Sequence, residues 1–131
     1  MYDLELHHVG MIVSDLDKAE KNLIHGDLVN QVYDPMQDAN LRLYKNHGSS
    51  FLELIQPLSE KSMTWNQLQK NSDHINHFCY SAKEKELIDI VSKEHKLIKI
   101  TDFMPAQLFP GHEVIFFYSR SKVVIEFLIN N

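Results

Sequence analysis

Residues 6–17 read Leu6-His7-His8-Val9-Gly10-Met11-Ile12-Val13-Ser14-Asp15-Leu16-Asp17, and the pattern changes halfway along this stretch. The first eight residues are mostly apolar and predict a β-strand. Ser14 is a good N-cap, and the two aspartates suit the first turn of a helix that continues to Leu23 or Ile24. Gly26 would then stop this helix. We therefore expect a strand followed directly by a helix.

The order of elements after this point is repeated. Three strands are expected after the helix, at residues 28–33, 41–45 and 50–56. A second series follows, with a strand at 75–80, an amphipathic helix at 82–95 and strands at 97–100, 114–118 and 123–129. We predict one α+β domain of two tandem βαβββ modules, at about 4–57 and about 73–130, with a linker at 58–72 that contains a short helix around 63–68. The modules should form a curved, mostly antiparallel open sheet with a barrel-like cleft and with the helices outside.

The repeat places one histidine and one glutamate in matching strands of each half. His8 and His77 stand in the first strand of their halves, and Glu53 and Glu126 stand in the last, at intervals of 45 and 49 residues. Each lies within an otherwise apolar face, where an unpaired carboxylate is costly to bury. Two neutral imidazoles and two carboxylates balance the charge of a divalent metal ion, which we therefore expect here. The alternative is that each residue is hydrogen-bonded or exposed in a half-solvated sheet.

Three other residues are weaker candidates for the site. His7 should point to the opposite face of its strand from His8, so we expect it to pack or to lie at the surface. His74 would replace His77 only if the strand register slipped. Cys79 shares a face with His77 and is expected to fill space.

The composition excludes several classes of protein. The 13 basic and 18 acidic residues give a formal charge of −5, which argues against a nucleic-acid partner. There is no apolar run near the roughly 18 residues that span a bilayer and no visible signal peptide, so we expect no membrane partner and a cytoplasmic location. Cys79 is the only cysteine, which excludes an internal disulfide and a thiolate-based zinc site.

The motifs resemble the vicinal oxygen chelate superfamily, which includes glyoxalase I, methylmalonyl-CoA epimerase, extradiol dioxygenases and antibiotic-resistance proteins. They are His7-His8-Val9-Gly10-Met11-Ile12-Val13-Ser14-Asp15-Leu16, Leu52-Glu53-Leu54-Ile55-Gln56-Pro57, His77-Phe78-Cys79-Tyr80 and Val124-Ile125-Glu126-Phe127-Leu128. The metal histidine of the family precedes a Val-Gly or Ile-Gly pair, which implies His8, and the other ligands match Glu53, His77 and Glu126. The stretch 110–118 looks closest to the epimerase and short glyoxalase-like branch. The turn at 119–122 lacks the Asp-Pro-Asp-Gly-like sequence usual in glyoxalase I.

The resemblance implies a metal-dependent isomerase or epimerase that removes a proton next to a carbonyl. Its small acyl or hydroxy-carbonyl substrate would chelate one Zn, Ni, Co or Mn ion. Glu126 is expected to be the base, and Glu53 would serve the other face of the same carbon. A homodimer is also expected, since two modules leave sheet edges open. Two alternatives stay open: a glyoxalase I-type lactoylglutathione lyase, and a resistance-type protein that binds a drug or metabolite without turnover.

Overall fold

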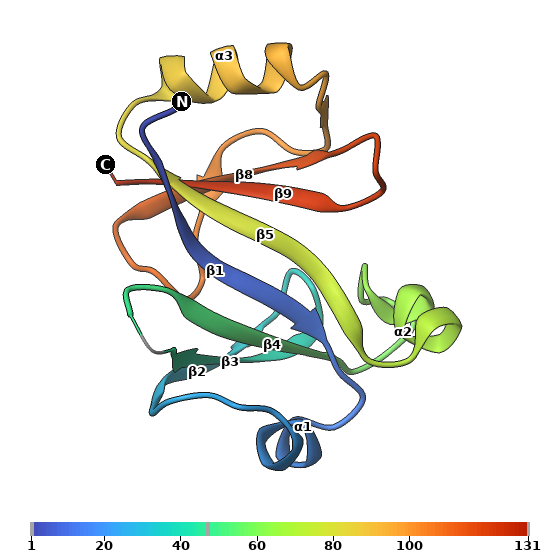
Figure 1. Ribbon diagram of the computed structural model, residues 1–131. Coiled ribbons are helices and arrows are strands. Elements are labelled where there is room, and N and C mark those ends of the chain that lie inside the picture. Colours follow the sequence, from blue (N-terminus) through green and yellow to red (C-terminus); the bar gives the residue numbers. More distant parts are fainter. Residues whose placement is uncertain (1, 47, 131) are drawn as a thin grey trace. The chain divides into compact units, whose positions relative to one another are not determined.

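The computed structural model describes residues 2–46 and 48–130. The described chain contains three helices and nine strands, in the order β1 (Leu4–Ile12), α1 (Leu16–Asn22), β2 (Leu28–Asp34), β3 (Ala39–Lys45), β4 (Phe51–Pro57), α2 (Trp65–Asn71), β5 (His74–Ala82), α3 (Lys85–Glu94), β6 (Ile98–Lys99), β7 (Met104–Pro105), β8 (His112–Tyr118) and β9 (Val124–Asn130). The strands pair in the order β2-β3-β4-β1-β5-β9-β8-β6, with β7 on β8 (Figure 1). This order has two ends, so the sheet is open and does not close into a barrel. The predicted α+β fold with an open sheet is confirmed.

The chain divides into two compact units. One unit consists of Met1–His8 and His77–Asn131, and the other is the continuous segment Val9–Asn76. Both boundaries fall inside strands, because β1 continues from residue 8 to residue 9 and β5 from residue 76 to residue 77.

In the unit Val9–Asn76, α1 packs on the strands through a buried apolar cluster. Its members are Val13, Leu16, Ala19, Tyr44, Leu52 and Leu54. The ring of Tyr44 is fully buried, and its hydroxyl donates a hydrogen bond of 2.8 Å to Glu20 on α1. Arg42, two residues earlier on β3, forms an ion pair of 2.9 Å with Asp17 on the same helix. The helix is thus held by apolar packing and by two polar contacts from one strand.

The ends of α1 differ from the prediction. The N-cap is Asp15, whose carboxylate accepts a hydrogen bond of 3.1 Å from the Lys18 amide, and not Ser14. The helix ends at Asn22, before Gly26. Gly26 instead allows a close approach of two backbones, because its amide donates to the Lys45 carbonyl at 2.6 Å and a Cβ would lie 2.7 Å from that oxygen. The glycine is therefore required by a strand contact and not by a helix stop.

The other unit is built on the β8–β9 hairpin, with β5 parallel to β9 (Figure 1). One face of these strands packs on α3 through Ala82, Ile88, Val91, Ile115, Phe117 and Phe127. The opposite face carries a second buried cluster of Cys79, Val114 and Leu128, with Phe109 and Phe116 packed against it. The tight turn predicted at 119–122 is present, since the Ser119 amide donates to the Val123 carbonyl at 2.9 Å.

Smaller differences concern short elements. The linker helix is α2, which begins at Trp65 and so lies slightly later than expected. The two-residue strand β7 was not predicted, because two residues carry no periodic signal. None of the helices in residues 2–46 and 48–130 has the length and apolar character needed to cross a bilayer.

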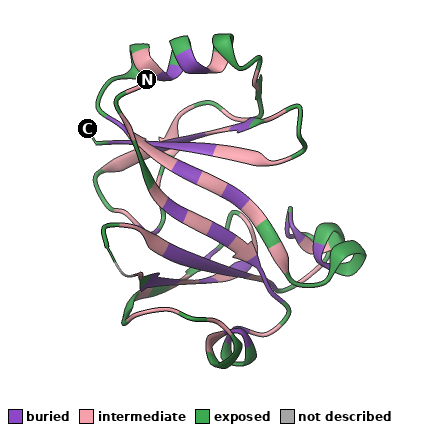
Figure 2. Ribbon diagram, in the orientation of Figure 1, coloured by how far each residue is buried: buried purple, intermediate pink, exposed green. Residues whose placement is uncertain are grey.

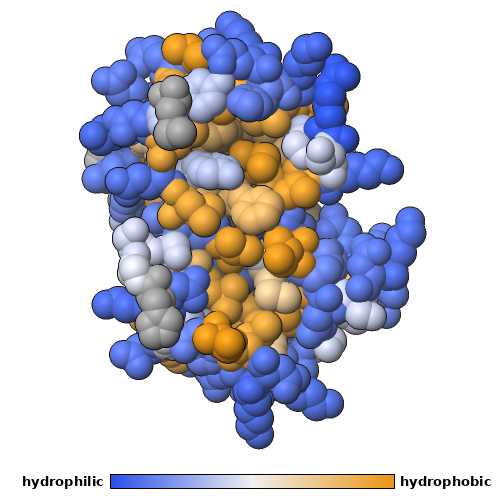
Figure 3. All heavy atoms as spheres, in the orientation of Figure 1, coloured by the Kyte–Doolittle hydropathy of each residue, from blue (hydrophilic) through white to orange (hydrophobic). Residues whose placement is uncertain are grey.

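Buried residues recur at intervals along two of the long strands. Figure 2 shows buried positions recurring along β1 and β5, as expected for strands with alternating environments. Figure 3 shows hydrophobic side chains gathered over the strands of the visible face and hydrophilic side chains over the helices. The buried positions include three polar side chains that belong to the same unit, and these form the candidate site.

Candidate metal centre

His8, His77 and Glu126 converge in the buried interior of the unit formed by residues 1–8 and 77–131. The Nε2 atoms of His8 and His77 lie 3.1 Å apart, and each lies 3.1 Å from Oε1 of Glu126. The exposed fractions of the three residues are 1%, 3% and 6%. Three of the four residues predicted as metal ligands are therefore brought to one point.

Strand pairing explains where Glu126 points. Its neighbour Phe127 packs into the cluster beneath α3, so alternation turns Glu126 to the opposite face of β9. In register, Glu126 lies between Cys79 on β5 and Phe116 on β8. His77 lies near the same place, with its ring centroid 6.3 Å from that of Phe116 in an edge-on contact. The carboxylate thus enters an apolar face at the position where the imidazole of β5 can meet it.

The environment of Glu126 has opposing effects on its charge. Burial raises the pKa of the carboxyl, because it penalises the ionised form. Hydrogen bonds donated by His77 and His8, together with their charges, lower the pKa more strongly, to about 2. Glu126 is therefore ionised at neutral pH, as a metal ligand must be.

Protons alone satisfy this triangle of atoms poorly. Each Nε2 atom carries at most one proton and the ionised Glu126 carries none, so two protons must serve three contacts of 3.1 Å. At least one of the three contacts then brings together two lone pairs or two N–H protons, which repel each other. A cation among the three atoms uses all three lone pairs at once. In a tetrahedral zinc site with bonds of about 2.1 Å, ligand atoms lie about 3.4 Å apart, close to the spacing here. The donor set and its spacing therefore fit a divalent metal ion.

Glu53 lies in the middle of β4, in the unit Val9–Asn76. Its neighbours Leu52 and Leu54 belong to the cluster beneath α1, so its side chain points to the other face of β4. It is paired in register with Leu43 of β3, and only 8% of the residue is exposed. Its burial as a carboxylate agrees with a role that needs a charge partner, and its place as the fourth ligand stays a prediction.

His7 packs against an aromatic ring, as expected, but it also contacts His8, which the sequence did not predict. Its Nδ1 atom lies 2.9 Å from Nδ1 of His8, on the side of that ring away from Glu126. Ligand atoms of His7, His8 and Cys79 lie within 4.8 Å of one another. Phe109, which the sequence did not single out, contacts both histidine rings, with centroids 4.7 Å from His7 and 5.7 Å from His8. The two histidine rings therefore meet, although their residues are adjacent in one strand.

His74, the candidate that would replace His77 after a register slip, has a hydrogen-bond partner in its own unit. Its Nδ1–H donates a hydrogen bond of 2.8 Å to the Ser72 carbonyl. This contact holds the ring at the start of β5, in the segment Val9–Asn76.

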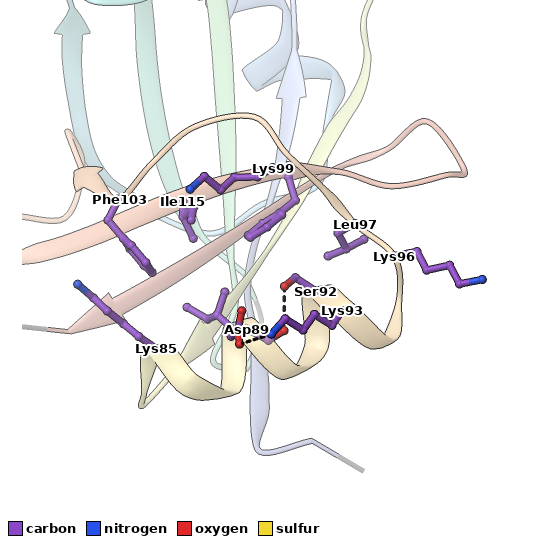
Figure 4. A pocket seen from close by; sticks show the side chains of 11 residues that line it. Lys85, Asp89, Ser92, Lys93, Lys96, Leu97, Lys99, Phe103 and Ile115 are labelled. Atoms are coloured by element: carbon purple, nitrogen blue, oxygen red, sulfur yellow. Dashed lines mark hydrogen bonds and ion pairs between the residues drawn. The ribbon is translucent and has the colours of Figure 1, made fainter.

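A cavity of about 480 Å³ lies elsewhere in the unit of residues 1–8 and 77–131 (Figure 4). It is lined by α3 and by Phe103, Ile115 and Phe117, with four lysines around it. Three of the lysines are paired with carboxylates: Lys85 with Glu113, Lys93 with Asp89 and Lys99 with Asp102. These pairs neutralise most of the positive charge, and none of the predicted metal ligands lines the cavity. The cavity therefore does not belong to the histidine and glutamate cluster.

Comparison with known proteins agrees with this fold. A hypothetical protein from Bacillus halodurans C-125 is 24% identical with a TM-score of 0.83, covering 99% of this chain and 96% of that chain. The methylmalonyl-CoA epimerase of Mycobacterium tuberculosis is 19% identical with a TM-score of 0.80, covering 96% and 87%. That of Streptomyces coelicolor, in complex with 2-nitronate-propionyl-CoA, is 17% identical with a TM-score of 0.79, covering 95% and 96%. No curated protein matches the sequence.

These structural likenesses show the fold. The sequence itself matches the profile of one family over residues 7–116, a span that includes His8, Glu53 and His77. The chain belongs to the glyoxalase/bleomycin resistance protein/dioxygenase superfamily.

Proposed function

We propose that this protein is a metal-dependent isomerase or epimerase that removes a proton next to a carbonyl group of a small acyl or hydroxy-carbonyl substrate. The observation that carries the proposal is the convergence of three ligand atoms, from His8, His77 and Glu126, at distances of 3.1 Å. Membership of the superfamily supports it, as does the likeness in fold to two methylmalonyl-CoA epimerases.

The ligand set that we propose is His8, Glu53, His77 and Glu126. Two imidazoles and two carboxylates suit Zn, Ni, Co or Mn. When bound, such an ion acts as a Lewis acid for the negative charge that develops on a substrate oxygen as the proton leaves. Phe116 and the apolar residues around Glu126 keep water away from these charged groups.

Glu126 is the proposed base. A base must be ionised before it acts, and the contacts with His8 and His77 keep this carboxylate ionised. As long as Glu126 contacts the two histidines, its lowered pKa makes it a weak base. Burial acts in the opposite direction and raises the pKa, so a carboxylate that moves away from the two histidines gains affinity for a proton. Glu53 would handle the proton on the other face of the same carbon.

Proton exchange tests this function directly. The protein is loaded with zinc and incubated in D₂O with methylmalonyl-CoA, and deuterium at the carbon next to the thioester carbonyl is followed by mass spectrometry. We expect exchange in the wild type and in Glu113→Gln, a control that removes another carboxylate of the same unit, and no exchange in Glu126→Gln.

Two other results would separate the alternatives. Exchange only with the hemithioacetal of glutathione and methylglyoxal would indicate a lactoylglutathione lyase. Tight binding of a small molecule without exchange in any acyl or hydroxy-carbonyl compound would indicate a binding protein and contradict the proposal.

We also propose a homodimer in the cytoplasm. Strand β2 stands at one end of the strand order and carries exposed Leu28, Val29 and Tyr33. An open edge with apolar side chains favours association with a second copy. The lone buried Cys79 is compatible with a reducing compartment. Light scattering after gel filtration should give twice the mass of 15.3 kDa, and a monomer would contradict the dimer.

A further inference from the structure

His8 uses both nitrogens of its ring. Its Nε2 atom faces Glu126 and His77 at 3.1 Å, and its Nδ1 atom lies 2.9 Å from Nδ1 of His7. His7 is half-buried, whereas His8 is almost completely buried. The second contact therefore forms at the edge of the interior, on the side of the ring that a metal ligand leaves unused.

The protonation of this pair follows from the proposed function. A contact of 2.9 Å between two ring nitrogens needs one proton and one lone pair. When Nε2 of a neutral histidine binds a metal, the ring proton must be on Nδ1. His8 would then donate from Nδ1 to Nδ1 of His7, which accepts and keeps its own proton on Nε2.

We propose that His7 is a positioning residue that fixes the tautomer and the ring orientation of His8 for metal binding. This inference rests on the proposed metal centre and adds a residue to it. Histidine ligands commonly donate their second N–H to a carboxylate, a carbonyl or water, and loss of that partner weakens metal binding about 10- to 100-fold. Here the acceptor is a neighbouring imidazole, which orients the ligand without adding another negative charge to a site that already holds carboxylates.

Phe109 restrains both members of the pair. Its ring meets His7 edge-on, at 86°, and lies nearly parallel to His8, at 25°. Phe109 itself packs against the buried cluster of Cys79, Val114 and Leu128. Phe109 therefore links the histidine pair to the buried cluster by packing against both rings.

The chain offers a matched pair of substitutions. In His7→Asn, the amide oxygen can stand at the place of the imidazole Nδ1 and accept the proton of His8. In His7→Leu, a side chain of similar bulk has no acceptor. The dissociation constant for Zn²⁺ alone is measured for wild type and both variants by competition with a chromophoric chelator, and the free energy of unfolding is measured without metal.

We expect His7→Leu to bind zinc about 10- to 100-fold more weakly, with His7→Asn close to the wild type. The metal-free stability of the two variants should be similar. In ¹H–¹⁵N spectra of the zinc-loaded protein, the Nδ1–H proton of His8 should be protected from exchange in wild type and His7→Asn, and broadened by exchange in His7→Leu. This signature reports on the hydrogen bond and not on packing.

If the wild type binds zinc, three outcomes would overturn the inference. Equal zinc affinity of wild type and His7→Leu would show that the contact is irrelevant to the metal. Equal losses in His7→Leu and His7→Asn would show that an acceptor is not what matters. A loss in Cys79→Ser as large as that in His7→Leu would indicate that His7, His8 and Cys79 bind the ion themselves. If the wild type bound no zinc, the proposed function would fail as well, so the two failures are distinguishable.

Discussion

The Nε2 atoms of His8 and His77 lie 3.1 Å apart, although 69 residues separate the two histidines in the sequence. The rings meet nearly at right angles, at 85°, and both point to the same carboxylate oxygen of Glu126. Two imidazole nitrogens that face each other at this distance cannot both be satisfied by their own protons if both donate to Glu126. A cation shared by the three atoms would use all their lone pairs at once.

Removal of either histidine should abolish stabilisation by metal. Zinc at 100 times its dissociation constant should raise the free energy of unfolding of the wild type by about 2.7 kcal/mol. In His77→Ala this increment should disappear, because one of the three converging ligands is lost. Urea unfolding with and without zinc measures it, and His74→Ala is the control, since that ring hydrogen-bonds to the Ser72 carbonyl. An increment that persists in His77→Ala would contradict the ligand assignment.

The ionisation of Glu126 should make the free energy of unfolding of the metal-free protein depend on pH in the acid range. Its pKa in the folded state is lowered from 4.5 to about 2, so the ionised carboxylate stabilises the fold above pH 4.5. That stabilisation is lost as the pH falls from 4.5 towards 2, where the folded protein takes up the proton. Glu126→Gln cannot titrate there. As the pH falls from 4.5 towards 2, the free energy of unfolding should therefore decrease more in the wild type than in Glu126→Gln. A difference between the two proteins that stays constant over this range would contradict the lowered pKa.

Glu53 is predicted to be the fourth ligand. Loss of a group that supports a metal ligand lowers metal affinity about 10- to 100-fold. Loss of a ligand itself should lower the affinity further. We therefore expect Glu53→Gln to weaken zinc binding by more than about 100-fold. The buried, uncharged amide should leave the metal-free fold intact, as circular dichroism will show. Zinc affinity equal to that of the wild type would remove Glu53 from the ligand set.

Gly26 should tolerate no side chain. A Cβ at this position would lie 2.7 Å from the Lys45 carbonyl oxygen, and the backbone hydrogen bond between the two residues leaves that oxygen no room to move. Overpacking of this kind typically costs about 1 to 3 kcal/mol. Gly26→Ala should lower the midpoint of urea unfolding accordingly, without an effect on zinc affinity. An unchanged midpoint would show that β3 and residue 26 separate easily.

The sequence predicted the parts of this structure that depend on local patterns. Alternation along residues 123–129 predicted that Glu126 and Leu128 share a face, and the buried clusters agree. The repeat of histidine and glutamate predicted that His8 and His77 would meet, because two imidazoles and two carboxylates in matching strands balance the charge of one divalent ion. Their role as metal ligands, and that of Glu53, stays a prediction.

What the sequence missed depends on contacts between distant or irregular segments. Alternation assigns His7 and His8 to opposite faces, yet the two rings meet beside Phe109. Phe109 stands in a loop next to Pro110 and Gly111, where no periodic pattern exists to show which way a side chain points. The N-cap fell one residue later than expected because Ser14 and Asp15 are both good caps, and only the folded chain distinguishes them.

The metal content of the purified protein tests the central claim most directly. Elemental mass spectrometry is applied to the wild type and to Glu53→Ala and Glu126→Ala, as isolated and after incubation with Zn, Ni, Co and Mn. We predict about one equivalent of one of these metals in the wild type, as four protein ligands imply, and loss of that metal in both variants. Absence of metal from the wild type after all four incubations would contradict the metal centre and, with it, the proposed chemistry.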